Sequence, residues 1–218
     1  GANPAAFGSP DEVPRGDMTA YGLVIDGVHY VGGCDTRAGP YPFCDVLDLP
    51  SYSLAKSLFA GLGSLALARE FPGVLDERIA DHVPVHEAVR AHFVERFRDA
   101  LDMATGHFES VRYDEDEKSP AMLPFFIAED HLTKIDFACR HFPRRAAPGT
   151  QWVYHTIDTY VLGTALEAFV KQKLDPGRDF YHDIIVTRLW APLALSPVLR
   201  ETRRTRDLAA QPFTGWGL

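Results

Sequence analysis

The sequence predicts an α+β fold in which a helical region packs on an antiparallel sheet. Strand-like residues 21–25 and 28–32 flank Asp26-Gly27, the strongest short-range signal for a β-hairpin. Much of the later chain carries apolar residues at intervals of three and four, which is typical of helices that bury one face. With 218 residues and 46% hydrophobic content, the chain is long enough and apolar enough to form a core.

The first helices follow the hairpin in order. Residues 53–68 form an apolar helical run that Phe71-Pro-Gly ends, and residues 74–85 are typical of an extended connection. Residues 86–101 carry apolar side chains at every fourth position, which predicts an amphipathic helix. Gly106 suits the C-cap that would end this helix.

The remaining chain is predicted to be mainly helical. Helices are expected over residues 129–141, 157–173 and 180–190, and residues 114–118 are typical of a charged surface loop. The first 18 residues are rich in proline, glycine and charge, which predicts an extended arm. Because no internal repeat or linker is visible, the expected organisation is this arm over 1–18 and one domain over 19–218.

Charge and composition exclude some classes of function. The net charge of −8 argues against a general affinity for nucleic acid, because phosphate binding requires clustered Lys and Arg. No stretch reaches the roughly 18 to 20 uninterrupted apolar residues of a transmembrane helix. The first residues show no signal peptide, which leaves a cytoplasmic location open beside a periplasmic or secreted one after trimming. Cys34 and Cys44 could form a disulfide in an oxidising compartment or stay free thiols.

Lys56, inside the apolar run, is the first indication of chemistry. A buried ammonium is costly unless it is paired or deprotonated, and burial lowers the pKa of a lysine so that it can act as a base. Ser53 lies three residues earlier on the same helical face, and a serine hydroxyl is a weak nucleophile until a base takes its proton. The pair predicts a nucleophilic serine. The same spacing also occurs on solvated helix surfaces, so other motifs must decide.

Further segments follow this pair in a familiar order. Residues 100–106 read ALDMATG, residues 148–167 read PGTQWVYHTIDTYVLGTALE, and residues 191–195 read APLAL. With Ser53 and Lys56, they resemble the motifs of the serine β-lactamase and penicillin-binding protein superfamily. The resemblance is greatest to the branch with class C β-lactamases, DD-peptidases and related esterases. Four matches in order are more specific than one motif.

The resemblance implies a β-lactamase/transpeptidase-like serine hydrolase that acts through an acyl-enzyme, with no metal or other cofactor. Its substrate would be a small molecule or peptide with a reactive ester, amide or β-lactam carbonyl. Ser53 would attack this carbonyl, and Lys56 and Tyr154 would carry the protons. Thr156 replaces the family asparagine, so the contact to substrate would come from Thr156, from His155 or from water. The alternative is a non-catalytic penicillin-binding sensor or scaffold.

The third family motif, Lys-Thr-Gly or His-x-Gly, does not occur in the sequence. The resemblance therefore implies a truncated domain, with an incomplete sheet and without the second oxyanion donor. We expect these 218 residues alone to be a poor catalyst and to associate through the unpaired edge of the hairpin at 21–32. A metal hydrolase that uses His82, His86 and His92 is a weaker alternative, because Pro84 interrupts the spacing of the first two.

Overall fold

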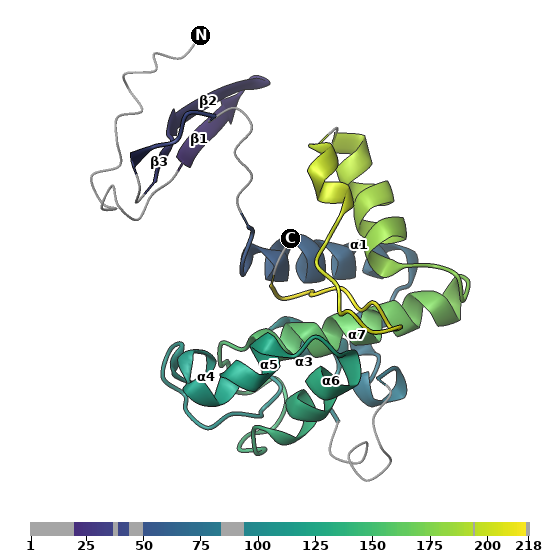
Figure 1. Ribbon diagram of the computed structural model, residues 1–218. Helices are drawn as coiled ribbons and strands as arrows, with labels where there is room; N and C mark the ends of the chain where they lie inside the picture. The colour runs from purple at the N-terminus through teal and green to yellow at the C-terminus, as the bar shows by residue number, and fades with distance from the viewer. Residues whose placement is uncertain (1–19, 37–38, 44–49, 84–93, 194, 217–218) are drawn as a thin grey trace. The chain divides into compact units, whose positions relative to one another are not determined.

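The computed structural model describes residues 20–36, 39–43, 50–83, 94–193 and 195–216 (Figure 1). The chain divides into two compact units, residues 1–49 and 50–218, and each is described by itself. The structure is α+β, as expected, with many helices and small antiparallel sheets of two strands each. The expected arm over 1–18 lies outside the described residues. The expected domain boundaries, and the expected packing of the helices on the sheet, therefore stay predictions.

The first unit contains the predicted hairpin. Strand β1 (Ala20–Ile25) pairs antiparallel with β2 (Val28–Gly33), and Ile25 lies opposite Val28. Asp26 and Gly27 both have positive φ, 51° and 75°, which is the backbone that a two-residue hairpin turn with the right twist requires. A second, shorter pair joins β3 (Asp35–Thr36) to β4 (Gly39–Pro40).

The cysteines of the chain differ in state. Cys34 is buried and disulfide-bonded, whereas Cys44, the partner considered from the sequence, lies outside the described residues. Cys139, in the second unit, is a free thiol, and burial raises its pKa to about 12. This thiol stays protonated at neutral pH and is a poor nucleophile.

The second unit is helical. The apolar run predicted at 53–68 is helical from Leu54 onward, as the π-helical segment η4 (Lys56–Gly61) and then α1 (Leu62–Glu70). Short helical turns and helices follow in chain order: η5 (Val74–Asp76), η6 (Ile79–Asp81), α3 (Phe97–Leu101), α4 (Glu115–Lys118), η7 (Pro120–Met122), α5 (Leu123–Ile127), α6 (His131–Arg140), α7 (Thr156–Lys173), η8 (Phe180–Trp190), η9 (Ala191–Leu193) and η10 (Pro197–Arg200). Within the described residues, no helix combines the length and the apolar character that crossing a membrane would require.

Helix α7 forms the centre of this unit (Figure 1) and contacts η4, α3, α6 and η8. Leu162, Ala165 and Leu166 on α7 have no exposed surface, which explains why this helix is apolar nearly all round. The Phe59 ring of η4 stacks on the Phe180 ring of η8, with 5.4 Å between the centroids. The predicted helices at 129–141, 157–173 and 180–190 are therefore confirmed as α6, α7 and η8, within two residues at each end.

The predicted structure of residues 74–101 needs correction. An extended connection was predicted over 74–85, but the described part, residues 74–83, contains two helical turns, η5 and η6. Of the helix predicted at 86–101, residues 94–96 are not helical and Phe97–Leu101 form α3, whereas residues 84–93 lie outside the described ones. Arg96 is extended (φ −96°), and its N–H donates to the Asp99 carboxylate at 2.8 Å, which caps the start of α3.

Residues 201–216 fold back against α7. The Phe213 N–H donates to the Arg203 carbonyl at 2.9 Å, which pairs the two ends of this segment. The close approach to α7 requires a glycine at position 163, because a Cβ there would lie 1.6 Å from Thr214 Oγ1. The segment thereby brings Gly215 against the first turn of α7, where a Cβ on Gly215 would lie 2.1 Å from Thr159 Oγ1.

Candidate active site

Ser53 lies immediately before the helix that carries Lys56. The backbone N–H of Lys56 donates to the backbone carbonyl of Ser53 at 3.0 Å, so Ser53 belongs to the first turn. The Ser53 side chain is partly exposed. The preceding residue, Tyr52, has a φ of +44°, a conformation that is rare for residues with a side chain. Backbone strain of this kind is concentrated at functional sites, where it fixes the direction of a neighbouring side chain.

The Lys56 ammonium is buried and fully hydrogen-bonded. Its side chain is 7% exposed, and Nζ lies 3.0 Å from Ser53 Oγ, 2.8 Å from Thr156 Oγ1 and 2.9 Å from the Gly215 carbonyl oxygen. Burial lowers the pKa of Lys56 to about 8, against the opposing charges of Glu117 and Asp114. About a tenth of these side chains are therefore neutral at pH 7, far more than for an exposed lysine.

Tyr154 contacts the same serine oxygen from the other side. Tyr154 Oη lies 2.5 Å from Ser53 Oγ, and Lys56 Nζ lies 4.8 Å from the centroid of the tyrosine ring. Burial raises the pKa of Tyr154, so the phenol keeps its proton at neutral pH. The structure thus brings together the three side chains predicted from the sequence as catalytic, with Ser53 Oγ between an amine and a phenol.

Thr156 and His155 lie behind this centre. Thr156 Oγ1 accepts a hydrogen bond from Lys56 and donates one to the Glu117 carboxylate, so its hydroxyl is already used. His155 has no exposed surface, and its ring stacks on Phe142 at 4.5 Å. Their predicted role was to contact substrate. The geometry instead places both in the interior, because the start of α7 buries them, and there they support the site from within.

Two acidic residues of the site were missed from the sequence. Residues 114–118 were predicted to be a charged surface loop, but they include α4, and Asp116 is 4% exposed. Asp116 accepts hydrogen bonds from the backbone N–H groups of Glu109 and Ser110 and contacts His155 Nε2 at 3.1 Å. Glu117 accepts from the Thr156 N–H at 2.9 Å. A buried Lys56 signals that a carboxylate must lie nearby, but not which of the 30 acidic residues it is.

Aromatic side chains surround the serine on the surface. Tyr113 is 74% exposed and stacks on Trp152, with 6.2 Å between the ring centroids and an angle of 11°. The Tyr154 ring lies 6.2 Å from Tyr113 and 6.4 Å from Trp152. These three rings form an exposed apolar surface next to the Ser53 hydroxyl, which suits an apolar group of a ligand.

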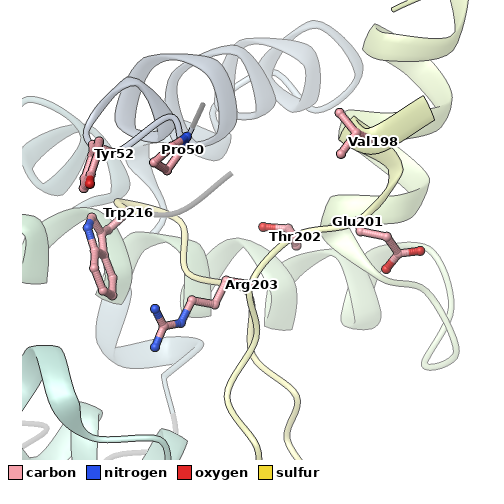
Figure 2. Close-up of a pocket in the computed structure, with 7 residues that line it drawn as sticks. All are labelled: Pro50, Tyr52, Val198, Glu201, Thr202, Arg203 and Trp216. Carbon is pink, nitrogen blue, oxygen red and sulfur yellow. The ribbon is translucent and has the colours of Figure 1, made fainter. Parts of the chain in front are cut away.

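A cleft of about 490 Å³ begins at Tyr52, the residue before Ser53 (Figure 2). It is lined by Pro50, Tyr52, Val198, Glu201, Thr202, Arg203 and Trp216. Trp216 follows Gly215, whose carbonyl binds Lys56, so two lining residues of this cleft are chain neighbours of residues in the catalytic cluster. A volume of this size is in the range of pockets that bind small molecules.

The described residues contain no group of three or more His, Cys, Asp or Glu side chains that could hold a metal ion. Of the three histidines considered for a metal site, His82 pairs with Glu77 at 3.2 Å. The other two, His86 and His92, lie outside the described residues, so the metal alternative is not tested by them.

No family model matches this sequence, and no curated protein matches it either. A solved structure described as SurE with D-Leu matches with a TM-score of 0.52 and 20% identity, over 90% of this chain and 43% of that chain. Another, described as SurE, matches with a TM-score of 0.49 and 21% identity, over 88% of this chain and 38% of that chain. The first match shows a likeness of fold. The chain spans less than half the length of the SurE chains that it matches.

The comparisons correct the family expected from the sequence. The matching structures are described as SurE, and neither is described as a β-lactamase, a penicillin-binding protein, a DD-peptidase or an esterase. The superfamily assignment is therefore not retained. With it we withdraw the β-lactamase-like fold, the acyl-enzyme serine hydrolase and the alternative of a penicillin-binding sensor or scaffold. The motifs behind the assignment are short, and short motifs carry a false-positive risk even when they occur in order.

Proposed function

We propose that this chain carries the catalytic centre of a group-transfer enzyme in which Ser53 is the nucleophile. Lys56 is the base that takes the serine proton, and Tyr154 hydrogen-bonds the same oxygen. The observation that carries the proposal is the position of Ser53 Oγ, 3.0 Å from Lys56 Nζ and 2.5 Å from Tyr154 Oη, on a partly exposed side chain. A nucleophile and a base at hydrogen-bond distance, with further groups that orient the base, are the signature of this chemistry.

The hydrogen bonds of Lys56 favour its use as a base. A neutral amine has two N–H groups and one lone pair. The Gly215 carbonyl can only accept, and Thr156 Oγ1, which donates to Glu117, must also accept from Lys56. Both N–H groups are thereby used, and the lone pair is left for the hydroxyl of Ser53. The surrounding residues thus orient the neutral amine toward the proton that it must remove.

The covalent step follows from this arrangement. Ser53 Oγ forms a bond to the electrophilic atom of the substrate while its proton passes to Lys56. The bond from that atom to the leaving group then breaks, and the leaving group takes a proton through Lys56 and the Tyr154 hydroxyl. In the second step a second small molecule bonds to the group held on Ser53 and the bond to Ser53 Oγ breaks. The proton that this molecule loses passes through Lys56 and Tyr154 to Ser53.

For the substrate we propose a small molecule that contains a D-amino acid residue with an aliphatic side chain. The SurE structure of similar fold is described as a complex with D-Leu. Around Ser53 of this chain, the exposed rings of Tyr113 and Trp152 offer an apolar surface of the kind that an aliphatic side chain would contact.

The nucleophile is tested with a fluorophosphonate probe and mass spectrometry of the labelled peptide. We expect the label on Ser53 and its loss in Ser53→Ala. Ser57→Ala is the matched control, because Ser57 is an exposed serine on the same helix and should label like wild type. A label on Ser51 or Ser57 that survives Ser53→Ala would contradict the proposal.

The substrate class is tested separately by protection. N-acetyl-D-leucine should slow the labelling of Ser53 more strongly than N-acetyl-L-leucine at the same concentration. Equal protection by the two enantiomers, or stronger protection by the L form, would exclude the proposed stereochemistry while leaving the nucleophile in place.

A further inference from the structure

The cleft in Figure 2 has one cationic side chain among its lining residues. Arg203 lies on its wall, with the guanidinium carbon 4.8 Å from the Trp216 ring centroid and 5.0 Å from that of Phe213. The rings position the guanidinium by stacking, which leaves its N–H groups available to donate hydrogen bonds. Among the described residues, no carboxylate lies within ion-pair distance of Arg203.

The neighbouring arginines of the segment, unlike Arg203, each form an ion pair. Arg204 contacts both oxygens of Asp179, at 2.7 and 2.9 Å, and Arg206 pairs with Glu129 at 2.9 Å. Arg203 belongs to the same short segment but faces the cleft. An arginine held against aromatic rings with free N–H groups is a common way to bind a carboxylate through two parallel hydrogen bonds.

We propose that the cleft is the subsite for the carboxylate-bearing end of the ligand, with Arg203 as the residue that binds the carboxylate. The inference rests on the proposed function, because the cleft is lined by Tyr52, which precedes Ser53, and by Trp216, which follows the Gly215 that binds Lys56. Tyr52, at 61% exposure, and Val198, at 50%, supply exposed apolar surface for the adjoining side chain. Glu201 also lines the cleft, and its negative charge opposes a ligand with more than the one negative charge that Arg203 balances. The ligand is therefore a monocarboxylate with an apolar substituent.

The test compares two ligands that differ only in charge. N-acetyl-D-leucine carries a free carboxylate, and N-acetyl-D-leucinamide does not. We expect wild type to bind the acid on the order of tenfold more tightly than the amide in calorimetric titration, as one charge-assisted contact provides. Arg203→Gln should remove this preference by weakening the acid about tenfold while leaving the amide unchanged. Arg206→Gln, which alters an exposed arginine of the same segment, should keep the wild-type preference.

The outcomes separate the subsite from the nucleophile. Equal binding of acid and amide by wild type, no binding of either, or an unchanged preference in Arg203→Gln would overturn the subsite. Labelling of Ser53 by a fluorophosphonate does not require Arg203, so failed labelling with an intact acid preference would overturn the proposed function alone. Arg203→Lys should retain part of the preference, because the charge remains but the planar pair of donors is lost. A Lys variant as weak as Arg203→Gln together with a lower melting temperature would show a structural role and would also overturn the subsite.

Discussion

The reactivity of Ser53 should rise with pH in a way set by Lys56. Burial lowers the pKa of Lys56 to about 8, so the neutral fraction is about 1% at pH 6, about a tenth at pH 7 and about nine tenths at pH 9. If only the neutral amine activates Ser53, the rate of fluorophosphonate labelling should increase about a hundredfold from pH 6 to pH 9. Most of that increase should lie below pH 8.

Two variants identify the group that titrates. Glu117 raises the pKa of Lys56 by its negative charge, so Glu117→Gln should move the midpoint of the labelling profile to lower pH. Lys56→Ala should label slowly and without this pH dependence. The assay measures labelling rates by mass spectrometry across the pH range, with the melting temperature as a control for folding. A flat wild-type profile, or a midpoint that persists in Lys56→Ala, would refute Lys56 as the base.

Three further outcomes are expected. Tyr154→Phe should lower the labelling rate on the order of tenfold to a hundredfold. The midpoint of the pH profile should not move, because the raised pKa of Tyr154 lies above the pH range of the assay. Near-wild-type rates would show that the hydroxyl takes no part in the reaction. Gly163→Ala should lower the free energy of unfolding by about 1–3 kcal/mol in denaturant titration, since its Cβ would lie 1.6 Å from Thr214 Oγ1, whereas Gly61→Ala, with 3.4 Å to its nearest atom, should be neutral or slightly stabilising. Lys134→Met should stabilise the protein by about 1 kcal/mol or more at pH 7, because it removes a buried ammonium that contacts the Phe125 carbonyl and aromatic rings and lies near the like charge of Arg203. Burial lowers the pKa of Lys134 in the folded protein to about 8, so the unfolded chain binds more protons than the folded one between pH 8 and about 10.5. The stability of wild type should therefore rise with pH in that window, and the gain in stability from Lys134→Met should shrink. A gain that stays constant with pH would contradict this account.

Local sequence signals were sufficient for the hairpin and for the buried helices. Asp26-Gly27 requires only its own backbone preference to make a tight turn, and the structure has it with positive φ at both residues. Helix α7 follows from its apolar composition over 18 residues, which outweighs any single contact. The prediction of a surface loop at 114–118 was wrong for Asp116, because a run of charged residues is typical of solvent exposure. Asp116 is buried because it accepts from the Glu109 and Ser110 backbone and contacts His155, and Glu117 accepts from the Thr156 N–H at the start of α7.

The family resemblance shows a different limit. Short motifs in order predicted that Ser53, Lys56 and Tyr154 lie together, and they do in the structure. The same motifs led to a superfamily that the comparisons do not return, because a nucleophile with its base can be built on unrelated folds and does not identify a substrate. The geometry of the centre is therefore informative about chemistry, and much less about ancestry.

The sequence by itself determined that Ser53 precedes Lys56 by one helical turn at the start of an apolar helix, because a spacing of three residues brings the two side chains to one side wherever that turn forms. Only the tertiary structure decided the state of that lysine. The Gly215 carbonyl is 159 residues away and Thr156 Oγ1 is 100 residues away along the chain. Thr156 reaches Lys56 because α7 packs against η4, and Gly215 does so because Gly163 lets the segment at 201–216 pack against α7. The same packing leaves Arg203 facing the cleft while Arg204 is paired with Asp179. Desolvation and hydrogen bonding depend on which groups lie close together in space, and contacts between residues this far apart in sequence cannot be predicted from a local sequence pattern.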